Sequence, residues 1–203
     1  MFHVRSVLAA AIHEYFQQNG YVYVNTPLIT GSDCEGAGEM FQVTTHAYGD
    51  EANYEDADAY YADDFFGQQA GLSVSGQLEG EMAAMAFGKI YTFGPSFRAE
   101  KSNTQRHVAE FWHVEPEVAF AELPDVLEIA EDMMKYVIKA AMERCPTELE
   151  FFNKFMEKGL LDKLQNVVDS DFEVLDYTKA IEILENADAD FKFPVSWGMD
   201  LQT

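Results

Sequence analysis

The opening residues show the spacing of apolar side chains, at intervals of three and four, that is typical of an amphipathic helix. Apolar positions run from Val4 to Phe16, and Gly20 stands where such a helix commonly ends. Residues 21–25 are mostly aromatic and β-branched, which predicts a strand that stops near Pro27. A second short strand is expected at residues 41–45.

The next part of the chain alternates between polar and apolar segments. Residues 48–64 are rich in Asp and Glu and have neither helical nor strand periodicity. Their like charges repel one another, so we interpret this segment as an exposed acidic insertion and not as a metal site. Residues 72–77 then predict a strand that ends with Ser75 and Gln77 on one face, followed by a helix around Met82.

Two strands separated by a polar loop are predicted near the centre of the chain. Residues 89–93 and 114–118 are rich in aromatic and β-branched types, and residues 101–105 are polar, as expected for an antiparallel hairpin. Beyond it, a long helix is predicted from Pro124 to Pro146, with shorter helices within residues 148–168 and at 178–184, and a strand-like stretch at 172–175. The whole pattern predicts one α+β domain spanning residues 1–203, with a mostly antiparallel sheet and helices on one side.

Composition limits the kinds of protein that this chain can be. It has 203 residues, 48% of them hydrophobic and 14% aromatic, which favours a folded globule. A formal net charge of −23 opposes nonspecific nucleic-acid binding. Cys34 and Cys145 show no disulfide framework and no zinc-ligand spacing with the five histidines, so we expect no metal site in this chain. No leader or membrane-spanning run is found, and a cytoplasmic protein without a membrane partner is expected.

The hairpin gathers cations in a chain that has few of them. Arg98, Arg106 and His107 lie near its loop, and an arginine fork matches phosphate oxygens in a bidentate manner. Glu100 is two residues after Arg98 and can accept a hydrogen bond from an amine, and Phe111 offers a flat surface for a base. These residue types favour a nucleotide site, although surface hairpins often carry weak Arg–Glu pairs as well.

The order of these residues is more specific than their types. The string Phe97-Arg98-Ala99-Glu100, a polar loop, Arg106-His107 and then Glu110-Phe111-Trp112 resembles motif 2 of class II aminoacyl-tRNA synthetases. The resemblance is strongest to the asparaginyl enzymes of the aspartyl/asparaginyl/lysyl subgroup. It implies the class II catalytic core, with motif 1 at about residues 4–27, motif 2 at about 89–118 and a helical insertion at about 122–190. Motif 1 builds the dimer interface in this family, so a homodimer is expected.

The resemblance also implies roles in ATP binding. These roles fall on Arg98, Glu100, Arg106, His107 and Phe111. Arg98 is then the catalytic residue, which grips the α-phosphate and the substrate carboxylate. Glu100 accepts a hydrogen bond from the adenine amine, and Phe111 stacks on adenine. His107, with Arg106, contacts the γ-phosphate.

The amino-acid pocket is implied by four other residues. Glu35, in a glycine-rich loop, is the expected acceptor for the substrate ammonium, and Ser75 and Gln77 match the family's pocket signature. Glu110 is the expected acceptor for the side-chain amide of asparagine. Related aspartyl enzymes carry a lysine shortly after the glutamine, whereas residues 78–81 here contain no cation. Because an unpaired buried carboxylate is costly, such a pocket favours asparagine over aspartate.

The implied activity is ATP-dependent formation of asparaginyl-adenylate and transfer of the amino acid to tRNA(Asn). The family's magnesium ligands and motif 3 follow the string that starts at Trp197, so Mg²⁺ ligands are expected beyond Thr203 and the chain is expected to be a fragment with little activity alone. The anticodon-binding domain, which precedes motif 1 in the family, is missing as well. Two alternatives stay open: a paralogue that makes asparagine through aspartyl-adenylate, and a non-catalytic module that keeps the fold.

Overall fold

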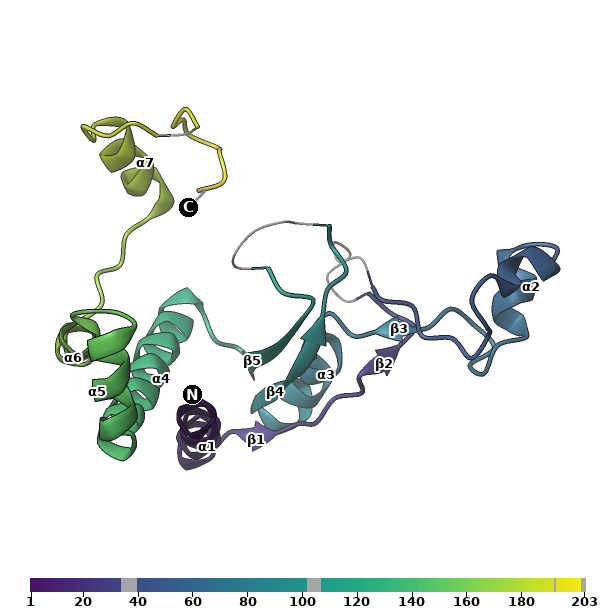
Figure 1. Ribbon diagram of the computed structural model, residues 1–203, viewed down its shortest axis with the longest axis horizontal. Coiled ribbons are helices and arrows are strands. Elements are labelled where there is room, and N and C mark those ends of the chain that lie inside the picture. Colours follow the sequence, from purple (N-terminus) through teal and green to yellow (C-terminus); the bar gives the residue numbers. More distant parts are fainter. Residues whose placement is uncertain (34–39, 102–106, 192, 202–203) are drawn as a thin grey trace.

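The computed structural model describes residues 1–33, 40–101, 107–191 and 193–201 (Figure 1). A mixed sheet lies at its centre, with strand order β1-β4-β5. The strands are β1 (Val22–Tyr23), β4 (Lys89–Phe97) and β5 (Glu110–Val118). β4 and β5 form the predicted antiparallel hairpin, whose pairing runs from Lys89 opposite Val118 to Phe97 opposite Glu110. β1 joins β4 in parallel, which the local pattern did not reveal.

Helices cover both faces of this sheet, whereas the sequence predicted helices on one side. On the first face, α1 (Phe2–Gln18) and α4 (Leu123–Arg144) cover an aromatic core. The Phe16 and Tyr91 rings stack there, 4.6 Å apart, and both residues are fully buried. On the second face, α3 (Gln77–Phe87) packs through Gly80, where an added Cβ would lie 3.4 Å from Ile90. The α+β class is confirmed.

The acidic segment is more ordered than its composition predicted. It contains a short 3-10 helix (Asp50–Asn53) and α2 (Ala57–Ala62), which lie on an arm away from the central sheet (Figure 1). Tyr60 is buried, and the ring of His46 packs on it at 4.5 Å. Asp64 accepts hydrogen bonds from the backbone N–H and hydroxyl of Thr45 at 2.9 and 2.6 Å. Hydrogen bonding to the side chain of Thr44, together with these bonds from Thr45, holds the pKa of the Asp64 carboxyl well below its usual range.

Two predicted strands are wrong. Residues 41–45 form only an isolated bridge, between Gln42 and Gly71, beside the two-stranded sheet of β2 (Ile29–Thr30) and β3 (Gly71–Leu72). Residues 172–175 have no regular structure. Ser75 and Gln77 do not end a strand either, because β3 stops at Leu72 and Gln77 is the first residue of α3.

The predicted helices of the C-terminal half are confirmed. α4 begins with a capping box between Glu122 and Asp125, with a proline in its first turn. α5 (Pro146–Phe155) and α6 (Leu160–Asp169) lie beside α4, and α7 (Tyr177–Glu185) stands apart from them near the C-terminus (Figure 1). Among the described residues, no helix is both long and apolar enough to cross a membrane.

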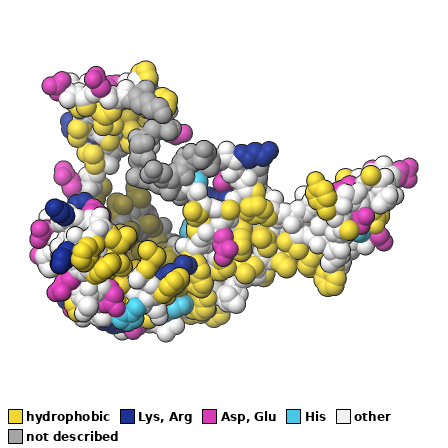
Figure 2. All heavy atoms as spheres, in the orientation of Figure 1, with side chains coloured by type: hydrophobic (Ala, Val, Ile, Leu, Met, Phe, Trp, Pro, Cys, Tyr) yellow, Lys and Arg dark blue, Asp and Glu magenta, His cyan; other side chains and the backbone are white. Residues whose placement is uncertain are grey.

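Hydrophobic side chains are widely exposed on this chain. Figure 2 shows them gathered over the central part of the molecule, while acidic side chains spread over its outer parts. On α3, Met82 and Met85 are 65% and 76% exposed, although both lie in an apolar helix. An exposed apolar surface of this kind marks a place for further packing.

Candidate functional site

The hairpin has one packed face and one face that carries chemistry. Strand side chains alternate between faces, so Phe93 and its partner Val114 point toward the aromatic core. Ser96, opposite Phe111, is on the other face. The same face continues through His113 and Glu115, the next alternate positions on β5. These residues form the candidate site.

Arg98 lies at the open end of this face. It follows β4 directly, and its backbone N–H donates to the carbonyl of Ala109 at 3.1 Å, which extends the ladder by one position. Its guanidinium carbon is 5.6 Å from the centre of the Phe111 ring, within the range of a cation–π contact. Both side chains are half-buried. The arrangement therefore offers a fixed positive charge beside a flat apolar surface.

The other predicted nucleotide ligands are at the edge of the site or outside the description. Glu100 and His107 are exposed, on the two segments that lead away from β4 and β5. Arg106 and Glu35 lie outside the described residues, so their predicted roles stay predictions.

A carboxylate that the sequence analysis missed lies at the closed end of the face. Glu115 accepts hydrogen bonds from the hydroxyl of Ser75, from the backbone N–H of Gly76 at 3.1 Å and from the hydroxyl of Thr92 at 2.7 Å. The His113 Nδ1 is 3.2 Å from Glu115 Oε1, the same oxygen that accepts from Ser75. Only 11% of the Glu115 side chain is exposed. Hydroxyl and amide donors therefore fix this carboxylate in one orientation.

The turn between β3 and α3 brings its donors to Glu115. Ser75 is buried, and its hydroxyl also accepts from the backbone N–H of Gln77 at 3.1 Å. Gly76 allows the close approach, since an added Cβ would lie 2.7 Å from the hydroxyl of Thr26. The side chain of Gln77 donates to Glu81 at 2.8 Å, one turn along α3. Ser75 thus belongs to the Glu115 network, while the Gln77 amide is directed along its own helix.

Glu110 does not join this group. It pairs with Phe97 at the end of the hairpin, one position away from Phe111, and so it points to the opposite face. It is exposed, and the next residue on its face, Trp112, packs against Phe93 at 5.0 Å. Glu110 is therefore not brought together with Ser75, and its role in the amino-acid pocket stays a prediction.

The surroundings of Glu115 are strongly negative. Burial raises the pKa of Glu117, the next residue on this face, and the nearby carboxylates of Glu81 and Glu115 raise it further. A second carboxylate entering this region would be repelled, whereas an amide N–H would find an acceptor. The closed end is thus suited to a neutral donor.

Contacts join the two ends of the site. The rings of Phe111 and His113 are 5.3 Å apart, and the His113 Nδ1 is 3.3 Å from the Ser96 hydroxyl and 3.2 Å from Glu115. From open end to closed end, the face thus presents a guanidinium, an aromatic ring and a fixed carboxylate. It can hold an anionic group, a planar base and a hydrogen-bond donor side by side.

The helix-flanked sheet, with an arginine and a phenyl ring on one face of its antiparallel hairpin, has the features that the resemblance to class II aminoacyl-tRNA synthetases implies. The family described as tRNA synthetases class II (D, K and N) matches residues 1–201. The chain belongs to this family.

Similar proteins point to one branch of the family. The asparagine–tRNA ligase of Clostridium novyi is 59% identical over 203 residues, and that of Bacillus cytotoxicus is 57% identical over 202. Both alignments cover 100% of this chain and 44% of the relative, so the chain spans less than half the length of these relatives.

Solved structures agree with this assignment. The asparaginyl-tRNA synthetase of Pyrococcus horikoshii, complexed with asparaginyl-adenylate, matches with a TM-score of 0.77 and 30% identity over 99% of this chain and 39% of that one. The Entamoeba histolytica asparaginyl-tRNA synthetase matches with a TM-score of 0.72 over 98% of this chain and 38% of that one. Its 22% identity supports the fold alone.

Proposed function

We propose that this chain is part of the catalytic domain of an asparagine–tRNA ligase and carries sites for ATP and asparagine. The single observation that carries the proposal is the continuous face from Arg98 through Phe111 to Glu115. The asparaginyl-adenylate named with the Pyrococcus horikoshii structure has an adenine, a phosphate and a side-chain amide. A ring, a guanidinium and a carboxylate are groups that can bind these three, one each.

The open end of the face is the proposed ATP site. Adenine stacks on Phe111, and Arg98 binds the α-phosphate and the substrate carboxylate in a bidentate manner. Glu100 accepts from the adenine amine, and His107 with Arg106 contacts the γ-phosphate. ATP enters as its Mg²⁺ complex, and the cation neutralises the phosphate oxygens that these residues do not reach.

The closed end is the proposed amino-acid site, with Glu115 in the role that the sequence analysis gave to Glu110. Glu115 shares a strand face with Arg98 and is already linked to Ser75, whereas Glu110 is on the opposite face. The asparagine amide donates to the Glu115 carboxylate. An aspartate side chain would instead meet Glu115 and its acidic neighbours, so this site disfavours the paralogue that activates aspartate.

The proposed reaction needs no general base. The asparagine carboxylate is ionised at neutral pH and attacks the α-phosphorus in line, which forms the P–O bond of asparaginyl-adenylate and releases pyrophosphate. The chain's own contribution is to position the two substrates and to stabilise charge at phosphorus through Arg98. The adenylate then passes its amino acid to tRNA(Asn).

The proposed dimer contact of the longer protein lies at the β1 edge of the sheet. β1 is an edge strand with both residues exposed, and α1 lies next to it. We expect this unit to build a homodimer in a cytoplasmic enzyme.

The nucleotide assignment is tested by Arg98→Ala in a full-length protein that carries this sequence. Loss of a preorganised donor from such a site costs about 3–4 kcal/mol, so asparagine-dependent ATP–pyrophosphate exchange should fall about 100-fold or more. Arg144→Ala is the matched control, because Arg144 makes an exposed ion pair with Glu14 at 2.7 Å, away from the hairpin. Exchange by the Arg98 variant within a few-fold of the control would refute the assignment.

A further inference from the structure

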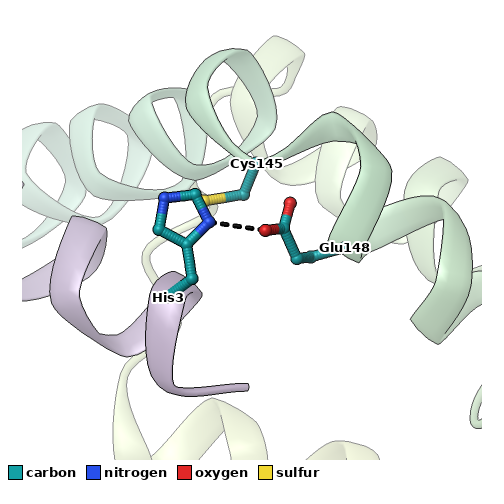
Figure 3. A group of neighbouring side chains, drawn as sticks. All are labelled: His3, Cys145 and Glu148. Carbon is teal, nitrogen blue, oxygen red and sulfur yellow. Dashed lines mark hydrogen bonds and ion pairs between the residues drawn. The ribbon is translucent and has the colours of Figure 1, made fainter.

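A second group of reactive side chains lies away from the hairpin, where α1 meets the junction of α4 and α5 (Figure 3). His3 is in the first turn of α1, Cys145 joins α4 to α5, and Glu148 is in the first turn of α5. The His3 Nδ1 is 2.5 Å from a Glu148 carboxylate oxygen, across 145 residues of sequence. The Cys145 sulfur, the imidazole nitrogen and the carboxylate oxygen all lie within 4.8 Å of one another.

The group is closed on one side and open on the other. Cys145 is fully buried, while the side chains of Glu148 and His3 are 31% and 60% exposed. Figure 3 shows the sulfur beside the imidazole ring, with the carboxylate directed at the ring nitrogen. The imidazole and the carboxylate are therefore open to solvent with the sulfur behind them, and an ion would have to pass between these two side chains to reach the sulfur.

We propose that His3, Cys145 and Glu148 form a zinc site that joins α1 to the α4–α5 corner. Thiolate, imidazole and carboxylate are the three ligand types that Zn²⁺ takes in proteins. Hard cations such as Mg²⁺ and Ca²⁺ select oxygen ligands instead, so the sulfur argues against them. A fourth position remains for water.

The distances allow this coordination with small movements. Zinc bonds of about 2.0–2.3 Å place tetrahedral ligand atoms about 3.3–3.6 Å apart. His3 and Glu148 must therefore separate slightly from 2.5 Å, and the sulfur must approach from at most 4.8 Å. His3 is exposed and in the first turn of its helix, so it can make this adjustment. The thiol proton leaves to solvent as the ion binds, and His3 ligates through an unprotonated Nδ1 while its ring proton is on Nε2.

The alternative is that no metal binds and that His3 and Glu148 form an ordinary ion pair beside a buried thiol. An exposed His–Glu pair contributes little to stability, and it requires no sulfur next to it. A zinc site, by contrast, makes all three side chains act together. It would stabilise the packing of α1 on the helical region without touching the nucleotide face of the hairpin.

Cobalt provides a direct probe of the sulfur. The metal-free 203-residue chain is titrated with Co²⁺, and a thiolate-to-cobalt charge-transfer band is expected in the near ultraviolet. The band should be absent in Cys145→Ser and present in Cys34→Ser, the matched control at the chain's other cysteine. No band in the unaltered chain, or a band that is lost with Cys34 and kept without Cys145, would overturn the proposal.

Zinc calorimetry tests the other two ligands and does not depend on the folding of a Cys145 variant. His3→Ala and Glu148→Gln change partly exposed side chains, and each should weaken Zn²⁺ binding about tenfold or more. Zn²⁺ should raise the melting temperature of the unaltered chain more than that of His3→Ala. Equal Zn²⁺ affinity and equal thermal shifts in the unaltered chain and both variants would show that only an ion pair is present.

Discussion

Two glutamates of β5, Glu110 and Glu115, give a sharp test of which strand face binds the amino acid. Glu115→Gln replaces the fixed carboxylate at the closed end of the site by a neutral amide of nearly the same shape. Glu110→Gln makes the same chemical change on the opposite, exposed face. The proposed asparagine site predicts a large effect of the first substitution and almost none of the second.

The magnitude follows from the contacts of Glu115. A hydrogen bond from the asparagine amide to a charged carboxylate is worth about 1.5–3 kcal/mol, and the glutamine amide retains only part of it. The lost charge should therefore lower kcat/KM for asparagine by at most about 10- to 150-fold. Stability should fall by about 1–3 kcal/mol, because the new NH₂ group faces donors from Ser75 or from Gly76 and Thr92.

Asparagine-dependent ATP–pyrophosphate exchange in a full-length protein measures the effect, with ATP and asparagine varied separately. The KM for asparagine should rise in Glu115→Gln while the KM for ATP changes little, since Phe111 and Arg98 are untouched. Selectivity against aspartate should also decrease. The proposed site would be on the wrong face if Glu115→Gln had normal kinetics while Glu110→Gln had lost asparagine-dependent exchange.

Three further predictions concern stability. Glu117→Gln should raise the melting temperature at about pH 8 but not below about pH 4. The reason is that a carboxyl with a raised folded-state pKa costs stability as the pH rises through that pKa. Equal shifts of the melting temperature at both pH values would contradict this. Asp64→Asn should loosen the α2 arm at neutral pH, measured by proteolysis of the arm. Because the folded-state pKa of Asp64 is lowered, the difference should be fully present above the unfolded value of 3.8 and should decrease as the pH falls from there through the folded-state pKa; a difference that does not change with pH would contradict this. Gly76→Ala should destabilise the chain by about 1–3 kcal/mol in urea unfolding, because its Cβ would meet Thr26, and an unchanged midpoint would show that the turn has room.

Local patterns were sufficient for much of the fold. The spacing from Val4 to Phe16 predicted α1, and the prolines at 124 and 146 marked the limits of α4 to within two residues. The hairpin was predicted because aromatic and β-branched residues flank a polar loop. Each of these signals lies within a short stretch of sequence, where propensity and periodicity act directly.

Features that depend on distant partners were missed. The parallel pairing of β1 with β4 joins segments that are far apart in the chain. The order of the acidic arm depends on the buried Tyr60 ring and on hydrogen bonds from Thr45 to Asp64, which charge composition does not reveal. Residues 41–45 had strand-like types but found only one bridging partner.

The structure brings together some of the predicted site residues and separates others. Arg98 and Phe111 were expected to act together, and they are in contact. Glu110 was predicted from the family resemblance, and Glu115 was given no role, although the alternation of a strand places Glu115, four residues after Phe111, on the same face as Phe111. Applying that alternation along all of β5 would have found Glu115 from the sequence.

The alternation of β5 has a consequence for how this chain tolerates change. A single residue inserted in the strand before Val114 would move every later side chain to the opposite face of the sheet. Val114 would then leave the hydrophobic core, and Glu115 would point into it. Point substitutions can damage recognition or packing separately, but a one-residue shift abolishes both in a single step. This strand can therefore tolerate substitutions, but not insertions or deletions of a single residue.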